Sequence, residues 1–161
     1  KGKELNLSNC GMHAMDIMRM ESGFLHWGHD ISPKENQYQA GLSFAISTKK
    51  QEDFIGKKSL DKIKKLRIKN RFAMFTLKNS KPGEPLLLHD EPIYLEDKII
   101  GRSTSGNYSF NFKKNLMFGY ITTDFSNEEL KSKELFIEVE KNKYPIELIS
   151  KPLKQTDFKN N

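Results

Sequence analysis

Cysteine is nearly absent from this sequence. Cys10 is the only cysteine among 161 residues, which excludes an internal disulfide framework and a cysteine-cluster metal site. No neighbouring residue would activate its thiol as a nucleophile, so we expect Cys10 to be a small residue in or near the core. A reducing compartment fits this composition, and we expect a cytoplasmic location.

Long apolar runs are also absent. The longest extend over only a few residues, whereas a membrane-spanning helix needs about 20, so we expect no membrane association. The opening residues, KGKELNLSNC, lack the apolar region of a secretory signal peptide and do not include an initiator methionine. The length suits one ordinary domain or two small ones, and we expect the chain to be a piece of a longer one.

Positive charge is concentrated in one segment. The net charge is +6, but residues 49–71 alone hold ten lysines or arginines and three acidic residues, a balance of +7 that leaves about −1 elsewhere. Such a segment attracts anions, and a nucleic acid or a polyanionic small molecule is a candidate. Aromatic side chains do not alternate with the lysines as a stacking surface requires. We therefore disfavour nucleic acid and interpret the segment mainly as the solvated face of a helix.

The first third of the chain contains one clear helical pattern. Residues 11–22, GMHAMDIMRMES, are mostly fair to good helix formers without proline. Met12, Met15 and Met18 fall three apart, and Ile17 and Met20 widen the stripe, which predicts an apolar face in the core. Arg19 interrupts this stripe, so it lies at the edge of the stripe or points toward a partner.

Two further elements are expected before residue 70. Residues 42–48, LSFAIST, alternate apolar and small polar side chains, which predicts a strand. A helix is expected from about Lys57, with Leu60, Ile63 and Leu66 as its buried stripe.

After residue 70 the sequence becomes a series of short apolar or alternating runs. Leu135, Ile137 and Val139 are expected to face one way on one such run, and turn signals such as Gly106-Asn107 are expected to separate the runs. Many short strands with frequent turns predict a barrel or sandwich. We therefore predict an α+β protein with two domains, residues 1–68 and an all-β domain of residues 69–161.

The stretch ESGFLHWGHDIS, residues 21–32, is the first candidate for chemistry. His26 and His29 could share a zinc ion with Asp30, but no third strong ligand is close in the sequence, so we predict no metal. The serines sit in no context typical of a hydrolase nucleophile. We predict no catalytic residue within the chain.

The order of several motifs resembles a known family. MRMESGFLHWGHDIS, ENQYQAGLSFAI and FIGKKSL, followed by EPIYLEDKIIGRSTSGNYSFNFKKNLMFGYI, are similar to the aminomethyltransferase (glycine-cleavage T-protein) family. The spelling HWGHDI looks most like the flavin-linked relatives, the dimethylglycine and sarcosine dehydrogenases. The resemblance implies a small α/β remnant of a ferredoxin-like lobe followed by a Greek-key β-barrel.

The resemblance also gives the HWGHDI turn a structural interpretation. We expect His26, Trp27 and His29 to seal the preceding helix against the neighbouring sheet, with Trp27 burying much of its surface. Asp30 would hold the turn through hydrogen bonds to the backbone. Direct ligand contact by Trp27 or His26 is the alternative.

The chemistry that the resemblance implies is transfer of a one-carbon unit from an N-methyl or aminomethyl donor to tetrahydrofolate. Arg19 and Arg71 match family arginines near the folate, whose carboxylates suit arginine forks, and we expect the two guanidiniums to converge on one cavity. Phe158 stands where the family has a tyrosine, so the ring is kept and the phenol hydrogen bond is lost.

The family's catalytic aspartate would lie upstream of everything that matches this chain. The flavin adenine dinucleotide (FAD) domain of the dehydrogenases would lie upstream as well. The resemblance therefore implies that folate and either an upstream part of the same protein or a partner subunit complete the site. The alternative is a non-catalytic regulatory or binding module of the same family.

Overall fold

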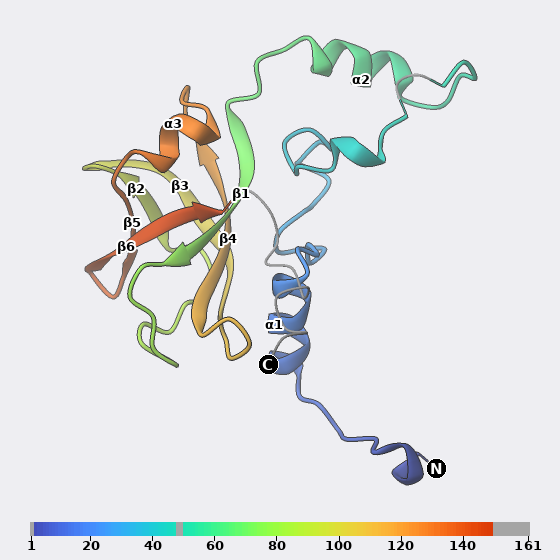
Figure 1. The fold of residues 1–161 in the computed structure, drawn as a ribbon. Helices are drawn as coiled ribbons and strands as arrows, with labels where there is room; N and C mark the ends of the chain where they lie inside the picture. Colours follow the sequence, from blue (N-terminus) through green and yellow to red (C-terminus); the bar gives the residue numbers. More distant parts are fainter. Residues whose placement is uncertain (1, 48–49, 150–161) are drawn as a thin grey trace.

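A computed structural model describes residues 2–47 and 50–149 of the protein. Two α-helices precede the first strand, and a third lies between β4 and β5 (Figure 1). The helical elements are the 3-10 turn η1 (Lys3–Leu5), α1 (Met12–Glu21), the 3-10 turn η2 (Ser43–Ala45), α2 (Lys57–Lys64) and α3 (Asn127–Lys131). The strands are β1 (Asn70–Leu77), β2 (Pro92–Leu95), β3 (Lys98–Ser109), β4 (Lys114–Thr122), β5 (Leu135–Val139) and β6 (Asn142–Ile149).

The strands close into a barrel in the order β1-β4-β3-β2-β5-β6. β2, β3 and β4 follow one another in the sheet, and β1 pairs with the other side of β4, which is the strand order of a Greek key. All the pairs are antiparallel. The expected α+β class with an antiparallel barrel is therefore confirmed.

Alternating side chains fill the interior of the barrel. Leu135, Ile137 and Val139 of β5 are buried and the residues between them are half-buried, as the sequence pattern predicts. Phe75 of β1 and Met117 of β4 reach the same cluster with no exposed surface. Burying each such side chain stabilises the fold by about 1.5–3 kcal/mol.

A second cluster joins α1 to the outside of the barrel. Met20 is buried against Leu116 and Phe118 of β4, and Ile17 and Phe72 pack beside them. α1 therefore lies along the outer face of the sheet beside β4 (Figure 1).

The helix predicted at residues 11–22 is present, but its methionine stripe is not buried. Met12, Met15 and Met18 are 70%, 53% and 59% exposed, so this expectation is wrong. The part of the predicted stripe that does contact the barrel is Met20 with Ile17. The three-residue spacing of the other methionines places them on a different face.

Two local predictions are also wrong. Residues 43–45 form a single 3-10 turn instead of a strand, because alternation alone does not provide a neighbouring strand to pair with. Gly106 and Asn107 lie within β3, paired with Met117 and Leu116, and form no turn.

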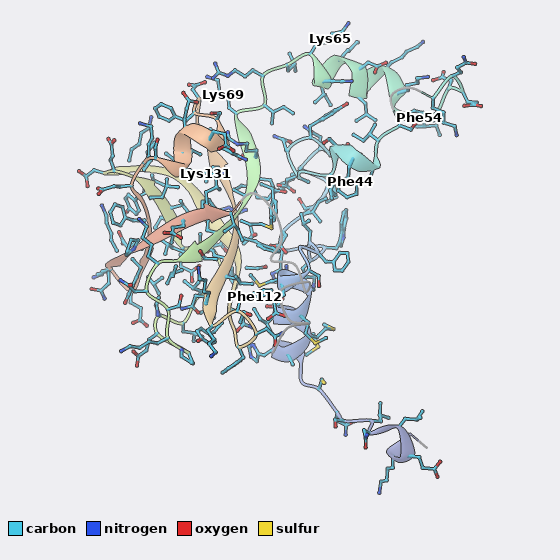
Figure 2. The ribbon with its side chains drawn as sticks, in the orientation of Figure 1. Phe44, Phe54, Lys65, Lys69, Phe112 and Lys131 are labelled. Atoms are coloured by element: carbon cyan, nitrogen blue, oxygen red, sulfur yellow. The ribbon has the colours of Figure 1, made fainter. Side chains whose placement is uncertain are left out.

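The part of the chain that holds η2 and α2 extends away from the barrel (Figure 1). α2 begins at Lys57 as predicted, but Leu60 and Ile63 are only half-buried and Leu66 is exposed. The labelled side chains Phe44, Phe54 and Lys65 lie on this segment, outside the barrel (Figure 2).

Two expectations about the surface can be compared with the structure. Cys10 is exposed, not in or near the core, because the residues before α1 run away from the barrel (Figure 1). Within the described residues, no helix combines the length and apolar character needed to cross a membrane.

Candidate functional site

Asp30 is the centre of a polar network between the turn after α1 and the barrel. Its side chain is fully buried. Thr104 and Ser105 of β3 donate their hydroxyls to Oδ1 at 2.5 and 2.8 Å, and the backbone N–H of His26 donates to Oδ2 at 2.9 Å. Arg19 forms an ion pair with the same carboxylate. A buried carboxylate is tolerated only with partners of this kind.

All three nitrogens of the Arg19 guanidinium donate hydrogen bonds within the protein. Nε donates to Asp16 Oδ1 at 2.8 Å, and Nη1 donates to the Phe24 carbonyl at 3.2 Å and to Asp30. Nη2 donates to Ser105 Oγ at 2.6 Å and lies 2.7 Å from Asp16 Oδ1. The side chain is only 15% exposed. Arg19 therefore fastens α1 to β3, and its predicted folate contact stays a prediction.

Glu21, the last residue of α1, is a second anchor at the same end of the helix as Arg19. It is buried, accepts a hydrogen bond from Ser109 Oγ, and accepts another from Asn111 Nδ2 at 2.8 Å. Arg19 and Glu21 thus anchor the last turn of α1 to Ser105 and Ser109 of β3. We did not assign a role to Glu21 from the sequence, although an acidic residue near the end of an amphipathic helix could have indicated a buried partner.

A cavity of about 410 Å³ lies between α1 and the barrel. Its walls are mostly apolar side chains from α1 and from the loop before β2, and it is lined by all four histidines of the sequence. We call it the histidine cavity. Its lining residues are Met12, His13, Met15, Asp16, Arg19, His26, His29, Leu86, Leu87, Leu88, His89, Thr104, Ser105, Gly106 and Asn107.

Gly106 brings the loop before β2 close to β3. A Cβ atom at this position would lie 2.3 Å from Leu87 Cβ, so only glycine allows the two segments to meet here. The glycine of the Thr-Ser-Gly motif therefore helps to shape the wall of the histidine cavity.

Trp27 does not seal the helix against the sheet. Trp27 is 66% exposed and His26 and His29 are exposed as well, so this expectation is wrong. The buried contact is made by Asp30, which satisfies β3 hydroxyls that an aromatic ring could not. The prediction that Asp30 holds the turn through the backbone is confirmed by its bond from the His26 N–H.

Trp27 lines a different cavity of about 710 Å³. We call it the aromatic cavity, because Phe24, Phe44 and Phe72 line it together with Trp27. It lies beside β1 and the end of β6, whereas Arg19 lines the histidine cavity. Two predicted site residues are thus assigned to separate cavities.

Arg71 is held on the opposite face of the sheet from Arg19. Nε donates to Asn127 Oδ1 at 3.0 Å and Nη2 donates to the Phe125 carbonyl at 2.6 Å. Along β1, Arg71 shares its side of the strand with the interior residue Ala73, and burial lowers the pKa of its guanidinium. The expected convergence of Arg19 and Arg71 on one cavity is therefore wrong, because the strand alternation separates them.

Phe158, the remaining predicted site residue, lies outside the described residues. Among the residues that the structure describes, no group of three or more potential ligands is arranged to hold a metal ion.

A polar cavity of about 680 Å³ lies next to the histidine cavity and is lined by Tyr120. The Tyr120 hydroxyl is buried and has no hydrogen-bond partner among the described residues. Burial, with smaller contributions from the charges of Glu35 and Asp30, raises the pKa of this phenol above its ordinary value.

Comparison with family models accounts for most of the chain. Residues 1–50 match the GCVT N-terminal domain, and residues 70–154 match the glycine cleavage T-protein C-terminal barrel domain. The chain belongs to the glycine cleavage T-protein family. This confirms the resemblance seen in the sequence.

Individual members of the T-protein family align over nearly the whole chain. The chain is 31% identical to the mitochondrial dimethylglycine dehydrogenase of Homo sapiens over 156 residues. This alignment covers 97% of the chain and 17% of that protein. The chain is 32% identical to the aminomethyltransferase of Alkaliphilus metalliredigens over 158 residues. This alignment covers 98% of the chain and 41% of that protein. The chain thus spans less than half the length of these relatives.

A solved structure of a T-protein shares the fold. This chain superposes on the crystal structure of the glycine cleavage system aminomethyltransferase T from Bartonella henselae with a TM-score of 0.73 and 22% identity. The match covers 88% of this chain and 38% of the Bartonella henselae chain.

Proposed function

We propose that this chain forms the C-terminal part of a tetrahydrofolate site in a larger T-protein-type enzyme. The enzyme would transfer a one-carbon unit from an N-methyl or aminomethyl donor to tetrahydrofolate. Relatives that align over nearly the whole chain are named as a dimethylglycine dehydrogenase and as an aminomethyltransferase, and both names fit such a donor.

The observation that carries the proposal is the histidine cavity. A folate needs apolar walls with a few fixed polar groups, and this cavity combines Met15 and Leu88 with buried hydroxyls of Thr104 and Ser105. It is formed where the two family motifs meet, at α1 and β3. Its volume of about 410 Å³ lies within the range for small-molecule sites.

Arg19 then acts as a positioning residue. Because its guanidinium is held by Asp16 and Asp30, it fixes the wall of the cavity and does not offer an unoccupied fork to a carboxylate. Direct folate contacts by Trp27 and Phe158 remain predictions that substitution can test separately. The position of Arg71 on the opposite face of the sheet speaks against the contact predicted for it, and substitution of Arg71 tests that contact as well.

The chemistry would be completed by residues outside this chain. We propose that an upstream part of the same protein, or a partner subunit, carries the catalytic aspartate and closes the open side of the cavity. In a dehydrogenase-type protein FAD would be bound by an upstream domain. We propose two domains, residues 1–68 and 69–161, and a cytoplasmic location, which cell fractionation would test.

Binding of 5-formyltetrahydrofolate to the full-length protein tests the proposal. Leu88→Asn removes an exposed apolar wall residue of the cavity, so we expect affinity to fall about tenfold, as loss of roughly 1.4 kcal/mol of apolar contact would cause. Ile55→Asn is the matched control, because Ile55 is fully exposed and away from the cavity. Absence of saturable folate binding, or equal loss in both variants, would contradict the proposal.

Folate binding without any one-carbon transfer, tested with N-methyl amines and with an aminomethyl donor, would instead favour the non-catalytic regulatory module.

A further inference from the structure

The four histidines of the chain come together from three segments. His13 lies on α1, His26 and His29 lie on the following turn, and His89 lies in the loop before β2. The His26 and His29 rings are 4.6 Å apart between centroids, and the His29 and His89 rings are 6.2 Å apart. Rings this close can share one ligand. The proposed folate binding does not by itself require any of them.

The fixed charges around these rings are mostly negative. Asp16 and Arg19 of α1 line the cavity, and Asp30 lies on the turn beside it. Asp90, Glu91 and Arg102 lie next to the lining residues Leu88 and His89, and Asp90 contacts His89 Nδ1 at 3.0 Å as well as Arg102. Four carboxylates and two guanidiniums thus lie in or beside the cavity, and no lysine lines it. With neutral imidazoles the cavity therefore does not favour an anion.

Protonation of the imidazoles reverses the sign of the net charge in and beside the cavity. Histidine is the side chain whose charge ordinarily changes between about pH 5 and 8. Two imidazoliums as close as those of His26 and His29 repel each other, and an anion that contacts both rings from one side offsets that repulsion. The protonated cluster therefore binds a carboxylate more tightly than the neutral cluster does. A bound carboxylate favours protonation of the cluster by the same factor.

We propose that the histidine cluster is a proton-dependent binding site for the carboxylate tail of a folate. His26, His29 and His89 take up protons as the carboxylates of the glutamate portion enter, while the apolar wall receives the ring system. The choice of folate rests on the proposed function, whereas the proton-dependent binding of a carboxylate rests on the cluster itself. Affinity for carboxylate-bearing ligands accordingly rises as the pH falls from about 8 to 6.

The probe is p-aminobenzoyl-glutamate, which carries the carboxylates of folate without the pterin. Calorimetric titration of the full-length protein should show affinity at pH 6 about tenfold higher than at pH 8, as expected for coupling to at least one imidazole. Titrations in two buffers of different ionisation enthalpy should show proton uptake on binding near pH 7. 4-Aminobenzamide, which has no carboxylate, should show neither effect.

The double variant His26→Gln, His29→Gln tests the assignment. Both side chains are exposed, so the fold should be kept while the pH dependence and the proton uptake are lost. Lys131→Gln, on α3, removes a positive charge outside the cavity and should leave both unchanged. Equal affinity at the two pH values, absence of probe binding, or a double variant that keeps the proton uptake would overturn the proposal.

Failure of this proposal can be told apart from failure of the proposed function. Folate that binds with the same affinity at pH 6 and 8 would overturn the proton dependence and leave the folate site standing. Proton-coupled binding of p-aminobenzoyl-glutamate by a protein that does not bind tetrahydrofolate would support the cluster and contradict the folate function.

Discussion

Arg19 and Asp30 form an ion pair at the base of the histidine cavity, with the Asp30 side chain fully buried and the Arg19 side chain 15% exposed. Arg19 comes from α1 and Asp30 from the turn that follows it, and both contact Ser105 of the barrel. One wall of the cavity therefore depends on a charge pair as well as on apolar packing.

Replacing Asp30 should release α1 from the barrel. Asp30→Asn removes the buried charge that pairs with Arg19 and leaves only Asp16 to compensate the guanidinium, so we expect a loss approaching that of a broken buried ion pair, about 3–5 kcal/mol. Hydrogen exchange of the α1 and β3 amides would measure this as a lower free energy of local opening. Asp124→Asn removes a carboxylate from an exposed ion pair and should cost at most about 1 kcal/mol. Similar losses in the two variants would contradict the network.

A side chain at Gly106 should disturb the contact between β3 and the loop before β2. In Gly106→Ala the added methyl meets Leu87 Cβ at 2.3 Å, and this atom cannot move away by a rotamer change, so we expect a loss of about 1–3 kcal/mol. Limited proteolysis of the loop around Leu87 should become faster. Gly11→Ala, which meets no atom within 4 Å, should cost less than about 1 kcal/mol. An unchanged cleavage rate in Gly106→Ala would show that the loop is not held by β3.

Removing Arg71 should affect α3 and leave the histidine cavity intact. Arg71→Ala removes donors to Asn127 and to the Phe125 carbonyl, so amides at the start of α3 should exchange faster. Because Arg71 lies on the opposite face of the sheet from Arg19, folate affinity should stay within about twofold, a difference of roughly 0.4 kcal/mol. A tenfold loss of affinity would instead restore Arg71 as a folate contact.

Tyr120 should make the protein sensitive to alkaline pH. Burial raises the pKa of its phenol in the folded state, so the neutral form is the one that the fold accommodates. The stabilisation is complete below the ordinary tyrosine pKa of about 10 and is lost as the pH rises above it.

Tyr120→Phe should keep its stability further into alkaline pH than the parent protein, as followed by urea denaturation at pH 8 and 11. Tyr108→Phe, at a half-buried position on β3, is the control. The same alkaline loss in Tyr120→Phe and the parent would rule out this role of Tyr120.

The alternation of buried and more exposed side chains made the strands of the barrel predictable. The polar contacts of the site join residues far apart in the sequence, and these contacts could not be predicted. The pattern of Leu135, Ile137 and Val139 correctly predicted one buried face, because each strand repeats every two residues. The role of Asp30 depends on hydroxyls of Thr104 and Ser105, more than seventy positions away. No pattern within a short stretch of sequence indicates such a distant partner.

The same limit explains the wrong expectations for α1 and for the arginine pair. The methionine spacing correctly indicated a helix, but which face contacts the barrel was decided by Met20 and by the polar anchors Arg19 and Glu21. The family motifs indicated Arg19 and Arg71 as folate contacts, and these two contacts stay predictions. The motifs could not show that the two residues lie on opposite faces of one sheet.

The most direct test of the account is hydrogen exchange of the full-length protein with and without 5-formyltetrahydrofolate. If the histidine cavity is the folate site, the ligand should slow exchange in α1, in residues 86–89 and in residues 104–107. Slowed exchange confined to the aromatic cavity around Trp27 and Phe44, with no change in these three segments, would contradict it.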